Sequence, residues 1–231
     1  MLQAVTQKFR NGCMMLGHDI GGKINFLGTS FIVHREGYLL TAAHLAADNA
    51  RLVVVPTVFT DEFTPITVNR VAAMPVTVAQ RDPDYDVALL RLEKPIGIDV
   101  PDDFLGNTVA VRSGASLMHL GYSFGHQHVH SLLAFNSIVS AKIRSPNSAR
   151  LILFDSMIQP GDRGGPLVHV ADSHIVGIVS GRFEAGEVAR GSTEWARETP
   201  PETNVSYAVA VEYGLELMRA EGLIPPAAAQ S

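Results

Sequence analysis

Cysteine is nearly absent from this sequence of 231 residues, in which Cys13 stands alone. A single cysteine cannot form an intrachain disulfide, so a disulfide-stapled scaffold is excluded. Cys13 is expected to precede the first strand of the fold. The N-terminal residues 1–10 also lack a basic segment that leads into an apolar core, so they make a poor signal peptide. Both absences favour a reducing compartment, and we expect the protein to be cytoplasmic.

Long apolar runs and an excess of basic charge are missing too. No stretch of about eighteen apolar residues occurs, so no membrane association is expected. The 18 Lys and Arg residues are outnumbered by 23 Asp and Glu residues, which gives a formal net charge of −5. Binding to nucleic acid therefore has no electrostatic support. The hydrophobic fraction of 46% instead indicates a globular protein with a sizeable core.

The sequence does contain many short β-like runs separated by Gly, Pro, Asn and Asp. Such spacing predicts an all-β fold, either a sandwich or barrels, rather than alternating strands and helices. We expect strands at 26–33, 38–41, 51–55, 67–72, 76–79, 87–92, 109–111, 116–121, 132–139, 151–154, 167–170, 175–180 and 205–210. A linker at 96–106 divides the single domain 1–231 into halves at 11–95 and 107–210.

Helical signals are few. Leu215, Leu217 and Met218, followed by Gly222, predict a C-terminal amphipathic helix over 211–222. The only other helical signal is a short turn at 42–48. The Pro- and Ala-rich tail 223–231 is expected to be disordered.

Three local patterns follow one another in an order that suggests chemistry. The first is Thr-Ala-Ala-His at 41–44, where small residues at a strand end can present the histidine ring to a cleft. The second is Asp86 followed by the apolar run 87–90, which places a carboxylate at the edge of a core. The third is Gly-Asp-Arg-Gly-Gly-Pro-Leu at 161–167, whose glycines allow backbone N–H groups to converge. Each pattern has an ordinary structural interpretation, but all three in this order point to a catalytic site.

Together these patterns resemble the trypsin-like serine proteases of chymotrypsin fold, and most closely the bacterial Deg-type branch, which also lacks disulfides. The resemblance implies two six-stranded antiparallel β-barrels with a C-terminal helix. It also implies peptide-bond hydrolysis of a polypeptide substrate, without a metal or another cofactor. In that scheme His44 is the general base and Asp86 orients it. The oxyanion hole is expected in the loop of Gly161, Asp162 and Arg163, from the N–H groups of Gly161 and residue 163.

The nucleophile position of this resemblance holds Arg163 where serine is expected. A guanidinium has only donors and no lone pair for attack, so the chain as written is predicted to be inactive. The side chain is expected either to plug the oxyanion hole or to pair with Asp86 or Asp162. Neither Ser156 nor Cys13 is placed to replace the missing serine. Two explanations stay open: an inactivated variant of a serine endopeptidase, and a natural pseudoprotease that binds a peptide or protein.

The resemblance also places four substrate-binding residues, Met157, Ser180, Gly181 and Arg182. Met157 falls at the pocket floor, where an apolar side chain favours a hydrophobic or medium-sized residue over a basic one. The segment 180–182 matches the strand that pairs with substrate backbone, and Ser180 also matches a serine that supports the aspartate. Arg182 is expected to narrow the pocket or to favour acidic groups. The segment 184–204 is expected to form a long surface loop near the cleft.

Histidines offer one alternative site. His126, His128 and His130 alternate, so in a strand they would share one face and could hold a metal. No carboxylate or cysteine lies near them in the sequence, so an exposed hairpin without a metal is the favoured interpretation. The remaining candidates are interpreted as ordinary surface or core residues: His18, His119, His169 and His174. A regulatory protein partner is a further hypothesis, because a protease inside a cell needs control, and the sequence does not indicate an oligomeric state.

Overall fold

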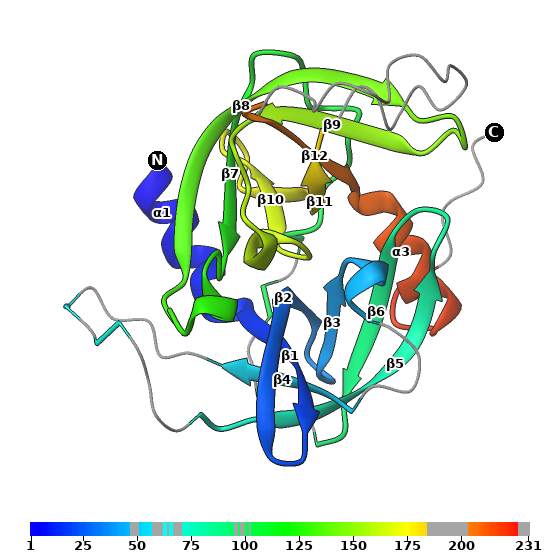
Figure 1. Cartoon of the computed structure of the whole chain (residues 1–231). Helices are drawn as coiled ribbons and strands as arrows, with labels where there is room; N and C mark the ends of the chain where they lie inside the picture. The colour runs from blue at the N-terminus through cyan, green and yellow to red at the C-terminus, as the bar shows by residue number, and fades with distance from the viewer. Residues whose placement is uncertain are drawn as a thin grey trace, which may run out of the picture.

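Two closed antiparallel β-barrels make up the structure, a computed structural model that describes residues 1–46, 51–56, 62–63, 65–66, 71–94, 97, 100–101, 103–183 and 203–225 (Figure 1). In the first barrel the strands are hydrogen-bonded in the order β1-β2-β3-β6-β5-β4. These strands are β1 (Cys13–Ile20), β2 (Lys23–His34), β3 (Tyr38–Thr41), β4 (Leu52–Pro56), β5 (Met74–Asp82) and β6 (Val87–Leu92).

The second barrel has the strand order β10-β11-β12-β9-β8-β7. Its strands are β7 (Ser116–Gly121), β8 (Leu133–Arg144), β9 (Arg150–Asp155), β10 (Pro166–His169), β11 (His174–Arg182) and β12 (Val205–Ala210). The short 3₁₀ turns are η1 (Arg10–Gly12), η2 (Ala43–Leu45), η3 (Gly125–Gln127) and η4 (Pro160–Asp162). The expected fold class, two six-stranded antiparallel barrels with a C-terminal helix, is confirmed.

The burial pattern of each strand reflects its position in the barrels. Along β8 buried and exposed residues mostly alternate, because one face looks into the barrel and the other toward solvent. In β6 only Arg91 is exposed, because one face of this strand lines the first barrel and the other packs on the second. The strand that carries Asp86 at its start is therefore held on both sides.

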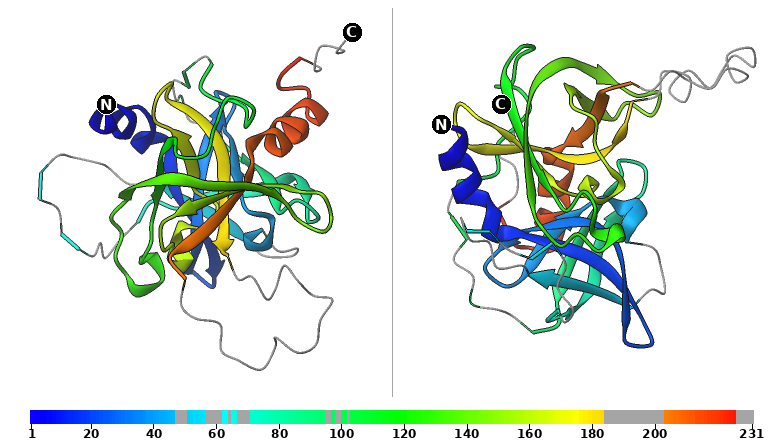
Figure 2. Two further views of the ribbon diagram at one scale, coloured as in Figure 1. Left: turned by 90° about the horizontal axis from the view of Figure 1, so that it is seen from above. Right: turned by 60° about the vertical axis from the view of Figure 1, so that its left-hand side comes forward.

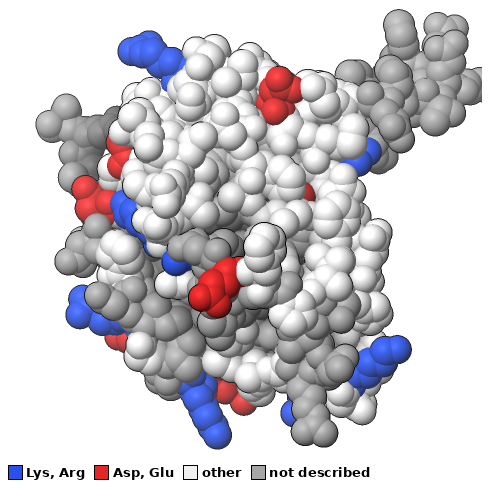
Figure 3. Space-filling view, turned by 90° about the vertical axis from the view of Figure 1, so that its left-hand side faces the viewer, with Lys and Arg blue, Asp and Glu red and all other residues white. Residues whose placement is uncertain are grey.

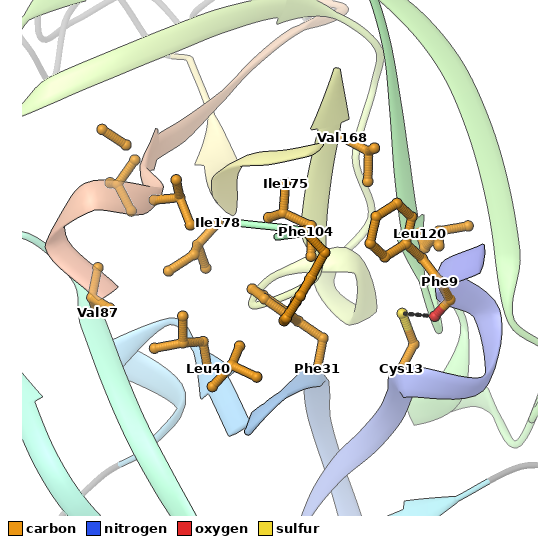
Figure 4. Packing of buried hydrophobic residues seen from close by; sticks show 14 of the residues in the cluster. Phe9, Cys13, Phe31, Leu40, Val87, Phe104, Leu120, Val168, Ile175 and Ile178 are labelled. Atoms are coloured by element: carbon orange, nitrogen blue, oxygen red, sulfur yellow. Dashed lines mark hydrogen bonds between the residues drawn. The ribbon is translucent and has the colours of Figure 1, made fainter. Parts of the chain in front are cut away.

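Three buried clusters form the core. The first barrel encloses residues such as Leu16, Leu39, Val54 and Leu90. The second encloses residues such as Leu117, Phe154, Leu167 and Val179. The third cluster joins the two barrels, and Figure 4 shows part of it, including Phe31, Leu40, Leu120 and Ile178. This shared layer fixes the two barrels against each other.

Two α-helices lie on opposite sides of the molecule (Figures 1 and 2). The C-terminal helix α3 (Val211–Ala220) packs against the first barrel, and its Tyr213 ring stacks on Tyr85 with 4.1 Å between the ring centroids. The helix α1 (Leu2–Phe9) was not expected; its buried residues Val5 and Phe9 are one helical turn apart. No helix in the described part of the chain is long and apolar enough to cross a membrane.

Some expectations on single segments are wrong. Cys13 is the first residue of β1 rather than a residue ahead of the barrel, and burial raises the pKa of its thiol, whose Sγ donates to the Phe9 carbonyl oxygen at 3.6 Å (Figure 4). The segment 109–111 forms no strand, and Val109 is exposed. Neither described residue of the expected strand 67–72, Val71 or Ala72, lies in a strand.

The segment after α3 differs in part from the disordered tail expected at 223–231. Leu223 and Ile224 are half-buried against the core between the barrels. The rest of the expected tail, 226–231, lies outside the described residues, as does most of the expected long loop, 184–202.

Candidate active site

His44 and Asp86 form the central pair of the site. His44 lies in η2 directly after β3, and Asp86 directly precedes β6, the strand that pairs with β3. The Asp86 carboxylate accepts from His44 Nδ1, with Oδ1 at 2.9 Å and Oδ2 at 3.0 Å, and from the His44 backbone N–H at 2.9 Å. Because a carboxylate can only accept, Nδ1 carries the proton. In its neutral form the ring therefore keeps its lone pair on Nε2, where it can act as a base.

Ser180 completes this network. It was expected to bind substrate and also to support the aspartate, and the structure places its hydroxyl on Asp86 Oδ2 as a donor. Burial alone raises the pKa of Asp86, but the hydrogen bonds from His44 and Ser180 and the charge of the His44 ring outweigh it and hold the pKa below its ordinary 3.8. The carboxylate is therefore ionised at neutral pH.

The loop that carries Arg163 fits closely against its surroundings. A side-chain carbon at Gly161 would lie 2.0 Å from the carbonyl oxygen of Tyr122. One at Gly164, where φ is +82°, would lie 2.2 Å from the carbonyl oxygen of Thr29. Only glycine allows the backbone to approach this closely, so both positions are fixed by packing as well as by any chemistry of the loop.

Thr29 of β2 clamps this loop to the first barrel. Its backbone N–H donates to the Arg163 carbonyl oxygen at 2.8 Å, and its hydroxyl donates to the Gly161 carbonyl oxygen at 2.7 Å. The same hydroxyl accepts from the Tyr122 N–H at 3.0 Å, and the Thr29 carbonyl oxygen accepts from the Thr41 hydroxyl at 2.8 Å. Every polar group of this fully buried residue is used.

Thr29→Val is expected to lower the free energy of unfolding by about 2–4 kcal/mol, because it leaves a buried N–H and a buried carbonyl without their partner. Urea unfolding measures this loss. Ser30→Ala is the matched control, because the neighbouring buried hydroxyl of Ser30 makes only one bond, of 3.4 Å. Equal losses in the two variants would show that the loop does not depend on the Thr29 hydroxyl.

Asp162 is fully buried and hydrogen-bonded within the protein. Its fully buried carboxylate accepts from the Ser123 hydroxyl at 2.5 Å and from the Gln159 N–H at 2.7 Å. Burial raises the pKa of Asp162 above its ordinary 3.8, although both hydrogen bonds act in the other direction. Its own N–H donates to the Gln159 carbonyl oxygen at 3.0 Å. This N–H is therefore used inside η4, which agrees with an oxyanion hole whose donors are expected from Gly161 and residue 163 and not from Asp162 itself.

The two expected oxyanion donors differ from each other. The N–H of Arg163 makes a long bond of 3.4 Å to the Pro160 carbonyl oxygen. The N–H of Gly161 donates no hydrogen bond to any residue that the structure describes. The Gly161 N–H is thus available to a ligand, and the Arg163 N–H is only weakly hydrogen-bonded.

The Arg163 side chain finds no carboxylate. Among the described residues its half-buried guanidinium makes no ion pair, and its buried Nε has no hydrogen-bond partner. Asp86 is occupied by His44 and Ser180, and Asp162 is buried on its own partners. The expected pairing of Arg163 with Asp86 or Asp162 is therefore wrong: neither carboxylate contacts the guanidinium, and both accept hydrogen bonds from other residues.

The expected pocket residues lie on the second barrel. Met157 follows β9 with 39% of its surface exposed. Gly181 and Arg182 end β11, and the Arg182 Nε donates to the Ile158 carbonyl oxygen at 3.2 Å. A cavity of about 260 Å³ lies between the barrels, and of the expected pocket residues only Arg182 lines it. Its lining includes Asp84, Tyr85, Arg182, Phe183 and Tyr207.

The three alternating histidines do not share a strand face. His126 lies in η3, and His128 follows it with φ of 63°, so the two-residue repeat of a strand is broken. His130 packs on Phe26 with 5.1 Å between the ring centroids. Among the residues that the structure describes, no three His, Cys, Asp or Glu side chains are arranged to hold a metal ion.

Two antiparallel barrels, with a histidine–aspartate pair on the first and a glycine-rich loop on the second, define a trypsin-like serine peptidase fold. A sequence model of the trypsin-like peptidase domain matches residues 28–178. The chain belongs to this family, and the resemblance drawn from the sequence is confirmed.

Named relatives place the chain near one branch of the family. A probable periplasmic serine endoprotease, DegP-like, from Pseudomonas fulva is 35% identical over 160 residues, which are 68% of this chain and 29% of the relative. A protein of the same name from Chlamydia pneumoniae is 26% identical over 155 residues, 65% of this chain and 28% of the relative. The chain therefore matches less than a third of the length of these relatives.

Solved structures agree on the fold. The HtrA-type protease AlgW with a tripeptide superposes with a TM-score of 0.69 at 21% identity, covering 95% of this chain and 63% of that chain. The same protease with a decapeptide gives a TM-score of 0.67 at 20% identity, covering 95% and 67%. At such identities the likeness supports the fold alone.

The expected cytoplasmic location is wrong. The relatives from Pseudomonas and Chlamydia are named periplasmic endoproteases. The expectation rested on the single cysteine and on the lack of signal-peptide features in residues 1–10. The two buried barrel cores contain no disulfide, so the single cysteine does not by itself identify a compartment.

Proposed function

We propose that this chain is a trypsin-like serine endopeptidase domain that is inactive as written, because Arg163 stands where the nucleophile belongs. The observation that carries this proposal is the intact network of His44, Asp86 and Ser180 beside a residue that cannot attack a carbonyl. In a peptidase with serine at this position, such a network would activate the serine hydroxyl. We assign the two halves 11–95 and 107–210 to one peptidase domain.

With serine at residue 163, the chemistry follows from the geometry. The hydroxyl oxygen attacks the scissile carbonyl carbon while His44 Nε2 takes the hydroxyl proton, and the same proton later goes to the leaving amine. Asp86 holds the ring in the required tautomer and stabilises the imidazolium that forms. The Gly161 N–H, joined by the N–H of residue 163, faces the oxyanion. With Arg163 the first step has no nucleophile.

The substrate we propose is a polypeptide in the periplasm. Relatives named periplasmic endoproteases and an HtrA-type protease with bound peptides support this class. Met157, which is apolar, favours a non-basic side chain in the pocket. In the face shown in Figure 3, Lys and Arg side chains are scattered rather than gathered, which offers no platform for nucleic acid. A regulatory protein partner stays a hypothesis.

The test is covalent labelling of the chain as written and of Arg163→Ser with a serine-reactive fluorophosphonate. We expect Arg163→Ser to label and the chain as written to remain unlabelled. The control, His44→Ala in the Arg163→Ser background, should abolish labelling, since the hydroxyl then lacks its base. Absence of labelling in a folded Arg163→Ser variant would refute the proposed peptidase geometry.

A second candidate function is peptide binding by a natural pseudoprotease. The guanidinium of Arg163, which has no carboxylate partner in the described part of the chain, favours it. The same residue in an independent natural isolate would support this candidate, and serine there would support an inactivated enzyme.

A further inference from the structure

Arg163, at the nucleophile position of the proposed site, is a cation that forms no ion pair with any residue that the structure describes. Its carbonyl oxygen accepts a hydrogen bond from the Thr29 N–H of the first barrel. The N–H of the next residue, Gly164, donates to the carbonyl oxygen of Val179, the neighbour of Ser180, at 2.7 Å. These bonds fix the backbone of the arginine between the barrels. Its side chain therefore starts from a rigid point, which reduces the entropy lost when it binds a ligand.

No residue that the structure describes forms an ion pair with Arg163. The two carboxylates expected to pair with it accept hydrogen bonds from other residues: Asp86 from His44 and Ser180, and Asp162 from Ser123 and Gln159. The Nε of Arg163 is buried without a hydrogen-bond partner among the described residues, and a buried donor in that state is costly. An anionic group from outside would satisfy both the charge and the donor.

We propose that this site binds a carboxylate, and specifically the free C-terminal carboxylate of a peptide. A guanidinium presents parallel donors that match the two oxygens of a carboxylate. The Gly161 N–H, which donates to no described residue, lies two residues away in the same loop and can bind one of those oxygens. The proposal rests on the proposed function in one respect, namely that peptides occupy the cleft between the barrels.

The position of Arg163 favours a chain end over a carboxylate within a peptide. In the proposed endopeptidase the scissile carbonyl lies beside residue 163, so a continuing chain would have to pass the long arginine side chain. A peptide that ends at this point fits, because its terminal carboxylate takes the place of the scissile carbonyl. A second cation, Arg182, lies at the end of β11, and no ion pair involves it among the described residues. It adds to the positive potential that an anionic ligand meets.

The test measures binding of fluorescein-labelled peptides with four alanines and a last valine, made with a free acid or an amide at the C-terminus. The chain as written is expected to bind the acid about 10- to 100-fold more tightly than the amide, the range typical of a hydrogen bond to a charged group. Arg163→Gln should remove this preference, and Arg163→Lys should keep part of it. Arg112→Gln, which removes the same charge from an exposed position, is the control and should leave the preference unchanged.

A third peptide identifies the source of the carboxylate. It has an aspartate as its last residue and an amidated C-terminus. If it binds as tightly as the free acid, the site accepts side-chain carboxylates, and the carboxylate class stands while the preference for a chain end falls. Equal affinity for acid and amide, no binding of either, or a preference that survives Arg163→Gln would overturn the proposal.

Failure of this proposal is distinguishable from failure of the proposed function. Fluorophosphonate labelling of Arg163→Ser reports only on the peptidase geometry, and the acid–amide comparison reports only on the Arg163 cation. A folded Arg163→Gln variant, checked by its thermal unfolding midpoint, keeps a loss of binding interpretable.

Discussion

In an Arg163→Ser background, Asp86→Asn is expected to lower kcat about 10,000-fold. The carboxylate of Asp86 accepts from the ring and the backbone of His44 and from Ser180, so it forces the imidazole proton onto Nδ1. An amide can donate as well as accept, and the ring can then carry its proton on Nε2. That tautomer cannot accept the proton of the attacking hydroxyl. The substitution also removes the charge that stabilises the imidazolium.

The measurement is kcat on a peptide substrate for Arg163→Ser alone and for the double variants. Glu93→Gln is the matched control, because it makes the same carboxylate-to-amide change at an exposed residue that directly follows the other end of β6. It should leave kcat within about twofold, since surface substitutions away from the site have small effects. A similar kcat in Asp86→Asn and Glu93→Gln, with both proteins folded, would show that Asp86 does not set the tautomer.

The site features that depend on residues close together in the sequence could be predicted. His44 in its small-residue turn and Asp86 ahead of an apolar strand are local patterns, and the register of β3 against β6 brings them together. The state of Arg163 could not be predicted this way. It depends on Ser180 reaching Asp86 across 94 residues and on Ser123 reaching Asp162 across 39 residues. Only the folded chain shows that these carboxylates are already occupied.

The helices and strands that the sequence did not predict correctly also depend on contacts far along the chain or on weak local patterns. The pairing of β1 with β2 shifts register between Leu16 and Gly17, so the strand lacks a clean alternation of apolar and polar residues. The helix α1 is too short to show a helical repeat. Val109 lies in an apolar run that suggests a strand, yet it is 79% exposed and has no neighbouring strand to pair with. Pairing partners far along the chain decide such segments.

His119 on β7 is a buried titratable group that affects acid stability. Its ring stacks on Phe135 with 4.7 Å between centroids and tilts against Phe154 at 5.5 Å. Neither ring nitrogen has a hydrogen-bond partner within the described part of the chain. Burial therefore lowers the pKa of His119 from 6.5 to about 4. This histidine could not be told from the others in the sequence, because its stacking partners lie on other strands, β8 and β9.

This shift makes folding depend on pH in a definite direction. The unfolded chain takes up a proton at this ring near pH 6.5, while the folded chain resists it until about pH 4. Between these values the unfolded state binds more protons, so stability is fully present above pH 6.5 and is lost as the pH falls. At about 1.4 kcal/mol per pKa unit, His119 costs the folded state about 3 kcal/mol at pH 4 relative to pH 7.

His119→Phe is expected to remove that loss. A phenyl ring fills nearly the same space between Phe135 and Phe154 and has no nitrogen to leave without a partner, so the variant should be at least as stable at pH 7. At pH 4 it should exceed the chain as written by about 3 kcal/mol in free energy of unfolding, measured with urea. Asp86, Asp162 and the other titrating groups are common to both proteins and cancel in the comparison. His126→Phe, which makes the same substitution at an exposed position, is the matched control. If His119→Phe destabilises the protein equally at both pH values, the buried ring is held by interactions other than stacking and does not control acid unfolding.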